Sequence, residues 1–290
     1  MKPTVALVLG SGGARGIAHI GVIHELINQG YEISSISGSS MGALIGGVYA
    51  AGKLDEFESW LCSLSKMDVF NLVDFTLSTQ GIIKADRVVN EIQKFIPDQN
   101  IEDLPIKYAA VTTDLINKKE VVITQGSLYD AIRASVSIPM VITPIKKIDT
   151  LLVDGGVLNP VPVNRVFRQE NDILIAVNLN ANIPYKKQKN ADTEGKLLEK
   201  LTRSKLNGFQ RKLSELLPGN KTGNMGYFNL ISETSSLMLL QIAKLTLELN
   251  PPDLLIEISR QSCGIFDFYK AAELIELGRN ETIKGLNKLN

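Results

Sequence analysis

The sequence predicts an α/β fold built on a parallel sheet. Within the first fifty residues, short apolar runs alternate with segments that repeat apolar residues at helical spacing, which is the order of strands and helices in a right-handed parallel sheet. The chain has 290 residues, of which 44% are hydrophobic and 21% charged, so it is long enough for one large core. Its 31 Lys and Arg balance its 31 Asp and Glu, and this neutrality excludes nucleic acid as the main partner.

The individual elements follow from the hydrophobic pattern. A continuous apolar run at residues 5–9, closed by Gly10, predicts a strand that is buried on both faces. Apolar residues at helical spacing predict a helix over 17–28, and a second strand over 33–37 and a small-residue helix over 41–51 follow. The remaining expected elements are strands over 106–113 and 120–124, a helix over 128–135, strands over 151–153 and 173–179, an apolar segment over 230–249, a candidate strand over 254–258 and a helix from residue 267 onward.

We expect a single domain over residues 1–290, and its parts are a catalytic core over about 1–181, a basic segment over 182–226 and a helical and strand extension over 227–290. Residues 186–212 carry nine basic side chains against three acidic ones, and the apolar residues of 206–217 fall on one helical face. Such a basic amphipathic helix either contacts an anionic membrane surface through residues 186–217 or packs its leucines on its own domain. The second arrangement is the commoner one in soluble proteins.

Few histidines and cysteines limit the available chemistry. His19 and His24 are the only histidines and lie five residues apart, so we expect no two-histidine metal site. Cys62 and Cys263 are too few for a disulfide scaffold or a thiolate zinc site, and no targeting segment is visible. We therefore expect a cytoplasmic protein, free or peripheral at the inner membrane surface.

Residues 38–42, Gly-Ser-Ser-Met-Gly, match the G-x-S-x-G pattern and stand between an expected strand and an expected helix. In that context the pattern marks a nucleophilic serine on a tight turn, with its Oγ exposed at the helix N-terminus. Gly38 and Gly42 flank the serine because the turn crowds its neighbours. Ser40 is therefore the candidate nucleophile, and the alternative is a serine-rich turn that only caps the helix.

A second glycine-rich segment, residues 10–16, joins the first strand to the first helix. Arg15 stands where a dinucleotide fingerprint needs glycine, and the ending of a Walker A loop is missing, so phosphate binding is the weaker interpretation. Adjacent parallel strands end at the same edge of a sheet. The backbone N–H groups of this loop are therefore expected to face Ser40 as an oxyanion hole.

A serine nucleophile needs a base, and the candidates are limited. Both histidines, His19 and His24, precede Ser40, so the serine, acid, histidine order of α/β-hydrolases is absent and packing or surface roles are expected for them. Two carboxylates at strand ends remain, namely Asp154, which two glycines follow, and its rival Asp114. A turn-forming Asp-Gly pair is the plain alternative for Asp154.

Four motifs follow one another along the chain. They are the glycine loop with Ile17-Ala18-His19-Ile20-Gly21, the turn at 38–42, the run Arg133-Ala134-Ser135-Val136-Ser137-Ile138-Pro139, and Asp154-Gly155-Gly156 with Asn159-Pro160-Val161-Pro162. This set resembles the patatin-like phospholipase family, especially its bacterial members, although Ser11 stands where the family often has glycine. The tail, with Pro251-Pro252-Asp253 and Asp267-Phe268, is also similar, so the resemblance covers nearly the whole chain.

The resemblance implies a three-layer α/β/α fold and hydrolysis of lipid acyl esters, of the phospholipase A, lysophospholipase or carboxylesterase type. Ser40 would attack the acyl carbonyl, Asp154 would accept its proton, and the N–H groups of Gly12 and Gly13, in a loop supported by Arg15, would hold the oxyanion. The implied substrates are phospholipids, lysophospholipids or other acyl esters, with no metal and no cofactor. A catalytically silent membrane-binding or acyl-chain-binding module of the same fold is the alternative, and a nucleotide-binding regulator is a third hypothesis.

Overall fold

The computed structural model describes residues 2–72, 74–77, 83–84, 86–97, 99–139, 141–185 and 227–289. The chain divides into two compact units, one of Met1–Tyr185 with Leu239–Asn290 and the other of Lys186–Met238. The basic segment 186–212, the helical face at 206–217 and the membrane contact expected there lie outside the described residues. The single-domain organisation stays a prediction.

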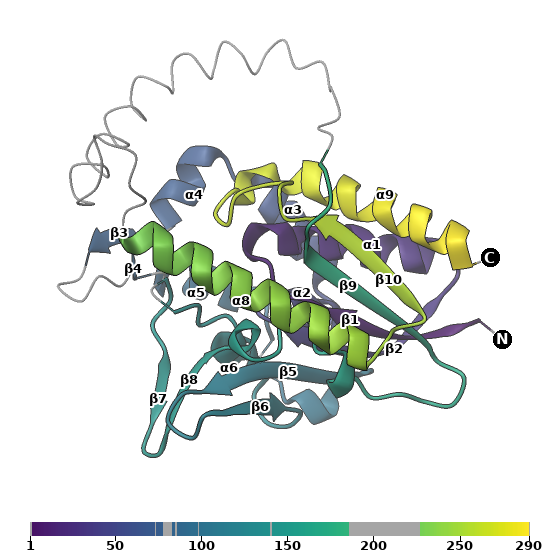
Figure 1. The fold of residues 1–290 in the computed structure, drawn as a ribbon, viewed down its shortest axis with the longest axis horizontal. Coiled ribbons are helices and arrows are strands. Elements are labelled where there is room, and N and C mark those ends of the chain that lie inside the picture. Colours follow the sequence, from purple (N-terminus) through teal and green to yellow (C-terminus); the bar gives the residue numbers. More distant parts are fainter. Residues whose placement is uncertain are drawn as a thin grey trace, which may run out of the picture. The chain divides into compact units, whose positions relative to one another are not determined.

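An eight-stranded sheet forms the centre of the first unit, in the order β10-β9-β1-β2-β5-β8-β7, with β6 paired to β5 (Figure 1). Neighbours from β10 to β5 run parallel, whereas β6, β7 and β8 pair antiparallel. The strands are β1 (Thr4–Leu9), β2 (Glu32–Ser39), β5 (Lys107–Asp114), β6 (Lys119–Ile123), β7 (Ile145–Lys147), β8 (Thr150–Asp154), β9 (Ile173–Ala181) and β10 (Leu254–Ser259). The expected strands are therefore confirmed, and the sheet is mainly parallel, as predicted.

The apolar run of β1 reflects its central place in the sheet. It is bonded to β2 on one side and to β9 on the other, so the side chains of Val5–Leu9 are buried on both faces. Leu9 lies opposite Gly38 in the register with β2. Because both strands run in the same direction, the glycine loop after β1 and the turn after β2 leave the sheet at one edge.

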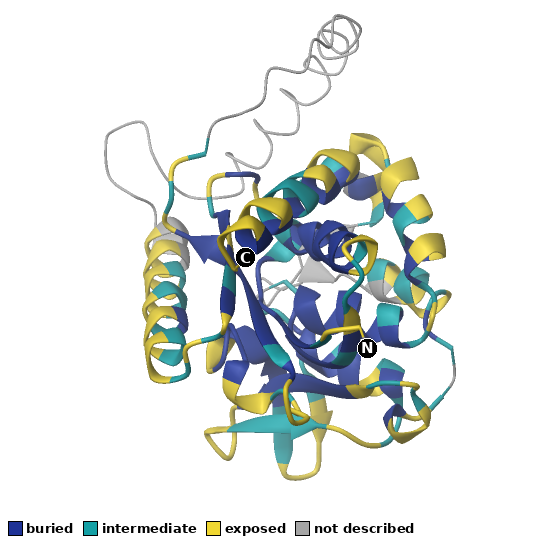
Figure 2. Cartoon of the chain, turned by 90° about the vertical axis from the view of Figure 1, so that its right-hand side faces the viewer, coloured by how far each residue is buried: buried dark blue, intermediate teal, exposed yellow. Residues whose placement is uncertain are grey.

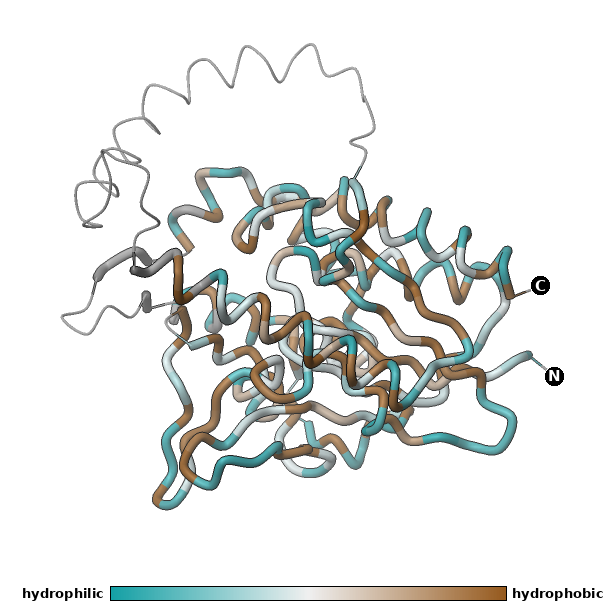
Figure 3. The backbone as a smooth tube through the Cα atoms, viewed as in Figure 1, coloured by the Kyte–Doolittle hydropathy of each residue, from teal (hydrophilic) through white to brown (hydrophobic). Residues whose placement is uncertain are grey.

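Helices cover both faces of the sheet and complete the three layers. On one face a large core joins the sheet to α1 (Ala18–Asn28), α2 (Met41–Ala50), α6 (Leu128–Ser135) and α9 (Ala271–Leu289). On the other face a smaller core includes Ala243 and Leu247, from the part of α8 (Tyr227–Leu249) that belongs to the first unit. Figure 2 shows the buried strands between helices with exposed outer faces, and Figure 3 shows the matching apolar colour along the strands.

Two parts of the fold have no counterpart in the expected elements, namely the short strand β7 and residues 54–93. Residues 54–93 contain α3 (Leu54–Ser63), α4 (Lys66–Leu72), α5 (Asp86–Gln93) and a small antiparallel pair, β3 (Asp74–Leu77) with β4 (Ile83–Lys84). In the described part of the chain, no helix is both long and apolar enough to cross a membrane.

Candidate active site

Ser40 stands on the turn between β2 and α2, where the G-x-S-x-G pattern places it. Its φ of 55° and ψ of −122° are outside the regions that L-residues favour, a conformation that costs about 1–3 kcal/mol and is concentrated at functional sites. The turn is crowded: a Cβ on Gly42 would lie 1.9 Å from the Leu9 carbonyl oxygen, and one on Gly38 would lie 2.4 Å from the Ala43 nitrogen. Both flanking glycines are therefore needed because backbones approach there.

The end of α6 holds the backbone of this turn. The Ser40 N–H donates to Ser135 Oγ at 3.0 Å, and the same hydroxyl donates to the Val111 carbonyl oxygen at 2.5 Å. Two residues further on, the Ser137 carbonyl accepts a hydrogen bond from the Asp154 N–H at 3.0 Å. The motif at 133–139 thus connects the two residues expected to form a dyad, a role that its sequence did not reveal.

Asp154 ends β8 beside the serine turn. The register pairs Ser39 with Val111 and Thr112 with Asp154, so β5 lies between the two strand ends. Asp154 is only 6% exposed. Its Oδ1 accepts the Gly156 N–H at 2.7 Å, and its Oδ2 has no hydrogen-bond partner within the described residues. Burial raises the pKa of Asp154 to about 6, against the opposing effect of the Ser40 hydroxyl and the Gly156 N–H.

The rival carboxylate, Asp114, has its oxygens occupied. It accepts hydrogen bonds from the N–H groups of Ile116, Asn117 and Leu151 and from the Asn117 side chain. These bonds, with that of the Asn117 side chain first, lower the pKa of Asp114. Asp114 therefore forms a turn, and the geometry favours Asp154 as the group that can receive a proton.

The glycine loop lies against the same turn. Gly13 has a φ of 56°, and a Cβ on Gly16 would lie 2.3 Å from Met41 Cβ, at the start of α2. The N–H groups of Gly12 and Gly13 have no acceptor among the described residues. Ser11 has no positive φ and donates its N–H to the Pro160 carbonyl oxygen at 2.8 Å, so a serine fits this position without backbone strain.

Arg15 supports this loop through a polar network. Its guanidinium group donates to Asn180 Oδ1 at 2.9 Å and to the Arg260 carbonyl oxygen at 3.1 Å. Asn180 in turn donates from Nδ2 to the Ser11 carbonyl oxygen at 2.7 Å. Sequence reasoning missed Asn180; the available signal was a polar residue near the end of a buried strand.

An apolar cavity of about 90 Å³ opens at Ser40 and Gly13. All its other lining residues are apolar, and α3 supplies Phe57, Trp60 and Leu61 to its wall. Phe57, Trp60 and Phe95 form an aromatic cluster with ring centroids 5.3–5.5 Å apart, in which Phe57 meets Phe95 edge to face. The site therefore offers a hydroxyl and free backbone donors at the end of a lining suited to a hydrocarbon chain.

Neither histidine is among the cavity-lining residues. His19 is buried, Nε2 donates to the Gly10 carbonyl oxygen at 2.8 Å, and burial lowers the pKa of His19 to about 4. His19 is therefore neutral at pH 7 and supports the start of the glycine loop. This agrees with the packing role expected for it.

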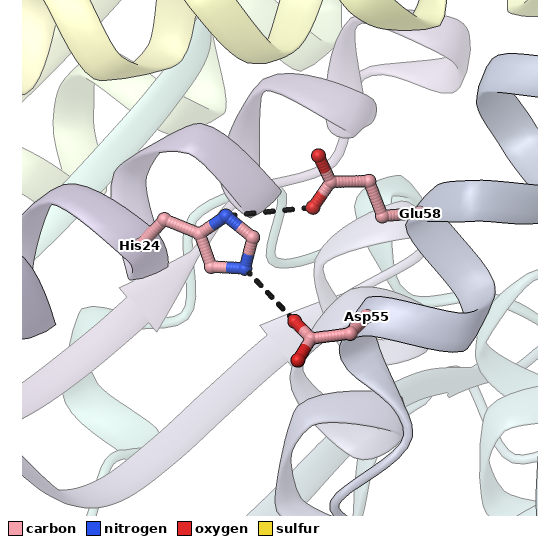
Figure 4. A group of neighbouring side chains, drawn as sticks. All are labelled: His24, Asp55 and Glu58. Carbon is pink, nitrogen blue, oxygen red and sulfur yellow. Dashed lines mark ion pairs between the residues drawn. The ribbon is translucent and has the colours of Figure 1, made fainter.

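The second histidine belongs to the group that Figure 4 shows, between α1 and α3. His24 Nε2 lies 3.4 Å from Asp55 Oδ1, and Nδ1 lies 3.4 Å from Glu58 Oε2. One ligand atom from each residue lies within 4.8 Å of the others, a spacing compatible with a divalent cation. However, the two carboxylates face opposite ring nitrogens, so one of them would have to move before both could bind an ion together with one nitrogen. The Asp55 side chain is also 91% exposed. The arrangement as it stands brings two carboxylates to one imidazole ring, which bridges them.

Comparisons with known proteins place the chain in a family. Residues 7–167 match the family described as patatin-like phospholipase. An uncharacterized NTE family protein of Mycobacterium tuberculosis is 35% identical over 323 aligned positions, which cover 96% of this chain and 90% of that protein.

Two further similarities are more distant. The lysophospholipase NTE1 of Yarrowia lipolytica is 31% identical over 185 positions, which cover 61% of this chain and 13% of that protein. Among solved structures, VipD from Legionella pneumophila aligns with 99% of this chain and 67% of its own, at a TM-score of 0.46 and 15% identity, and is too distant to inform the site. The family match over residues 7–167 and the 35% identity to the Mycobacterium tuberculosis protein show that this chain is a member of the patatin-like phospholipase family.

Proposed function

We propose that this protein hydrolyses acyl esters of lipids, with Ser40 as the nucleophile and Asp154 as the base. One observation carries the proposal: a buried carboxylate with an unpartnered oxygen lies beside a serine that opens into an apolar cavity. Family membership supports the same chemistry. Phospholipids and lysophospholipids are the proposed substrates, because the lining suits an acyl chain and a relative is named a lysophospholipase.

The proposed reaction has two halves. Ser40 Oγ attacks the acyl carbonyl carbon while Asp154 takes the hydroxyl proton, and the N–H groups of Gly12 and Gly13 bind the oxyanion. Collapse of this intermediate leaves an acyl-serine, and Asp154 returns the proton to the departing alcohol. Water then repeats the sequence, which releases the fatty acid and restores Ser40. A base with a pKa of about 6 suits this task better than an ordinary aspartate, because it is charged at pH 7 yet more basic.

Two parts of the proposal concern how the protein meets its substrate. Contact with an anionic membrane surface is proposed for residues 186–217, on the basis of their charge and apolar periodicity. Arg15 is proposed to keep the glycine loop in place through its bonds to Asn180 and the Arg260 carbonyl. The proposed dyad chemistry itself uses no metal and no cofactor.

The test combines a covalent probe with lipid substrates. A fluorophosphonate should label the wild type, and Ser40→Ala should abolish labelling and lower hydrolysis of lysophosphatidylcholine by about 10³-fold or more. Asp154→Asn should weaken both sharply. Ser39→Ala is the matched control, since this neighbouring serine is also buried but has no proposed role. Equal labelling of the wild type and Ser40→Ala would refute the role of Ser40 as the nucleophile.

A catalytically silent protein would give a different result. Trp60, the only tryptophan of the chain, lines the cavity, so its fluorescence should report an acyl chain that binds there. Fluorescence changes on addition of lysophosphatidylcholine, together with an unlabelled wild type and no hydrolysis, would support the acyl-binding module instead.

A further inference from the structure

We propose that Asn180 is a positioning residue that orients the Gly12 N–H for binding of the oxyanion. The inference rests on the proposed function, in which Ser40 attacks an acyl carbonyl and the glycine loop binds the resulting negative charge. Asn180 lies near the end of β9 and is 169 residues away from Ser11, the residue whose carbonyl it contacts.

Two hydrogen bonds define how the Asn180 side chain lies. Its Nδ2 donates to the Ser11 carbonyl oxygen at 2.7 Å, and its Oδ1 accepts from Arg15 at 2.9 Å. Because a guanidinium group only donates and a carbonyl only accepts, the two partners are compatible with one amide orientation. A second anchor holds the backbone, since the Asn180 N–H donates to Asn178 Oδ1 at 3.0 Å.

The consequence for Gly12 follows from peptide geometry. The Ser11 carbonyl and the Gly12 N–H belong to one peptide unit, and the structure has no cis peptide bond in the described residues. In a planar trans peptide these two groups point in opposite directions. A side chain that holds the Ser11 carbonyl therefore sets the direction of the Gly12 N–H, on the side of the peptide away from Asn180.

The Gly12 N–H is free to use that direction. It has no acceptor among the described residues, and the next residue, Gly13, lines the cavity together with Ser40. At the other end of the Asn180 side chain, Arg15 is half-buried and also donates to the Arg260 carbonyl oxygen. Arg15 thus prevents the Asn180 amide from rotating, and Asn180 prevents the Ser11–Gly12 peptide from rotating.

The test uses two substitutions of Asn180. Asn180→Asp has the same shape and still accepts from Arg15, but a carboxylate oxygen cannot donate to the Ser11 carbonyl and repels it. Asn180→Leu removes both bonds. An oxyanion donor that is lost entirely lowers kcat by about 10²–10³-fold, so a misdirected donor is expected to lower kcat by about 10–100-fold. KM should change by less than about threefold, because the donor acts in the transition state.

Asn178→Asp is the matched control. It places the same charge in the same strand, two residues away, at a side chain that is as buried as Asn180, and its carboxylate can still accept the Asn180 N–H. Its kcat should stay within about threefold of the wild type. Thermal unfolding of every variant shows whether it is folded. If neither Asn180 variant folds, Arg15→Gln tests the same network, and the same fall in kcat at constant KM is expected.

The outcomes separate this inference from the proposed function. A wild-type kcat in folded Asn180→Asp, with an inactive Ser40→Ala, would overturn the positioning role and leave the nucleophile intact. A change confined to KM would also overturn it. An active Ser40→Ala would overturn both, because no oxyanion would then form at this loop.

Discussion

Replacing Asp154 with Asn should stabilise the protein at neutral pH while it suppresses the proposed reaction. Burial raises the pKa of Asp154 from 3.8 to about 6, so the folded protein holds the charged carboxylate at a cost. One pKa unit corresponds to about 1.4 kcal/mol, and the rise therefore amounts to about 3 kcal/mol. The side chain is only 6% exposed, so solvent screens this cost little.

The sign of the pH dependence follows from proton binding. Between pH 3.8 and about 6 the folded protein binds more protons at Asp154 than the unfolded chain does, so this group lowers stability as the pH rises through that window. Above about pH 6 the whole cost is present, and below about pH 4 it is absent. Asn has no charge to bury and keeps an acceptor for the Gly156 N–H. Its new amide N–H has no partner, which costs about 1 kcal/mol of stability. The expected gain is thus about 2 kcal/mol at pH 7, with a loss of about 1 kcal/mol at pH 4.

Urea unfolding of the wild type and Asp154→Asn at pH 4 and pH 7 measures this difference. Asp114→Asn is the control with the opposite sign: hydrogen bonds, first that of Asn117, lower the pKa of Asp114, so its replacement should destabilise the protein at pH 7. In parallel, fluorophosphonate labelling of the wild type should rise about tenfold between pH 5 and pH 7, as Asp154 loses its proton. A stability difference that is the same at both pH values, or labelling that is flat across that range, would refute the raised pKa of Asp154.

Three further predictions concern the neighbourhood of the site. Ser135→Ala leaves the Ser40 N–H without its buried acceptor, so urea unfolding should show a loss of about 1–3 kcal/mol and labelling should slow; unchanged values of both would contradict the anchoring role. Gly42→Ala would place a Cβ 1.9 Å from the Leu9 carbonyl oxygen of β1, so we expect a loss of about 3 kcal/mol in the free energy of unfolding, or no soluble protein. Wild-type stability of this variant would show that the turn has room for a side chain. Cys62 is exposed, while Cys263 is buried and burial raises its pKa to about 11. A thiol reagent should therefore modify Cys62 in the native protein and Cys263 only after unfolding, and rapid modification of both would contradict the burial of Cys263.

Much of the fold was predictable because its signals are local. A strand that is bonded on both sides in a parallel sheet must be apolar throughout, and the run at 5–9 shows this pattern. Glycine at 38 and 42 is required where a turn meets neighbouring backbone, so the serine turn was also visible. The helix α3 was missed although Leu54, Phe57 and Leu61 repeat at helical spacing and are buried.

The parallel sheet, the serine turn and the adjacent glycine loop were predictable from sequence, since each depends on residues close together in the chain. The strand patterns left Asp154 and Asp114 as rivals, because both follow buried strands, and the resemblance to the family pointed to Asp154. The hydrogen bonds of the folded protein favour Asp154 as the proposed base. Asp114 accepts four hydrogen bonds, from Ile116, Asn117 and Leu151, whereas one oxygen of Asp154 has no partner among the described residues. Strand patterns do not encode this difference, because the burial of Asp154 and the bond from Leu151 to Asp114 depend on strands that are far apart in the sequence.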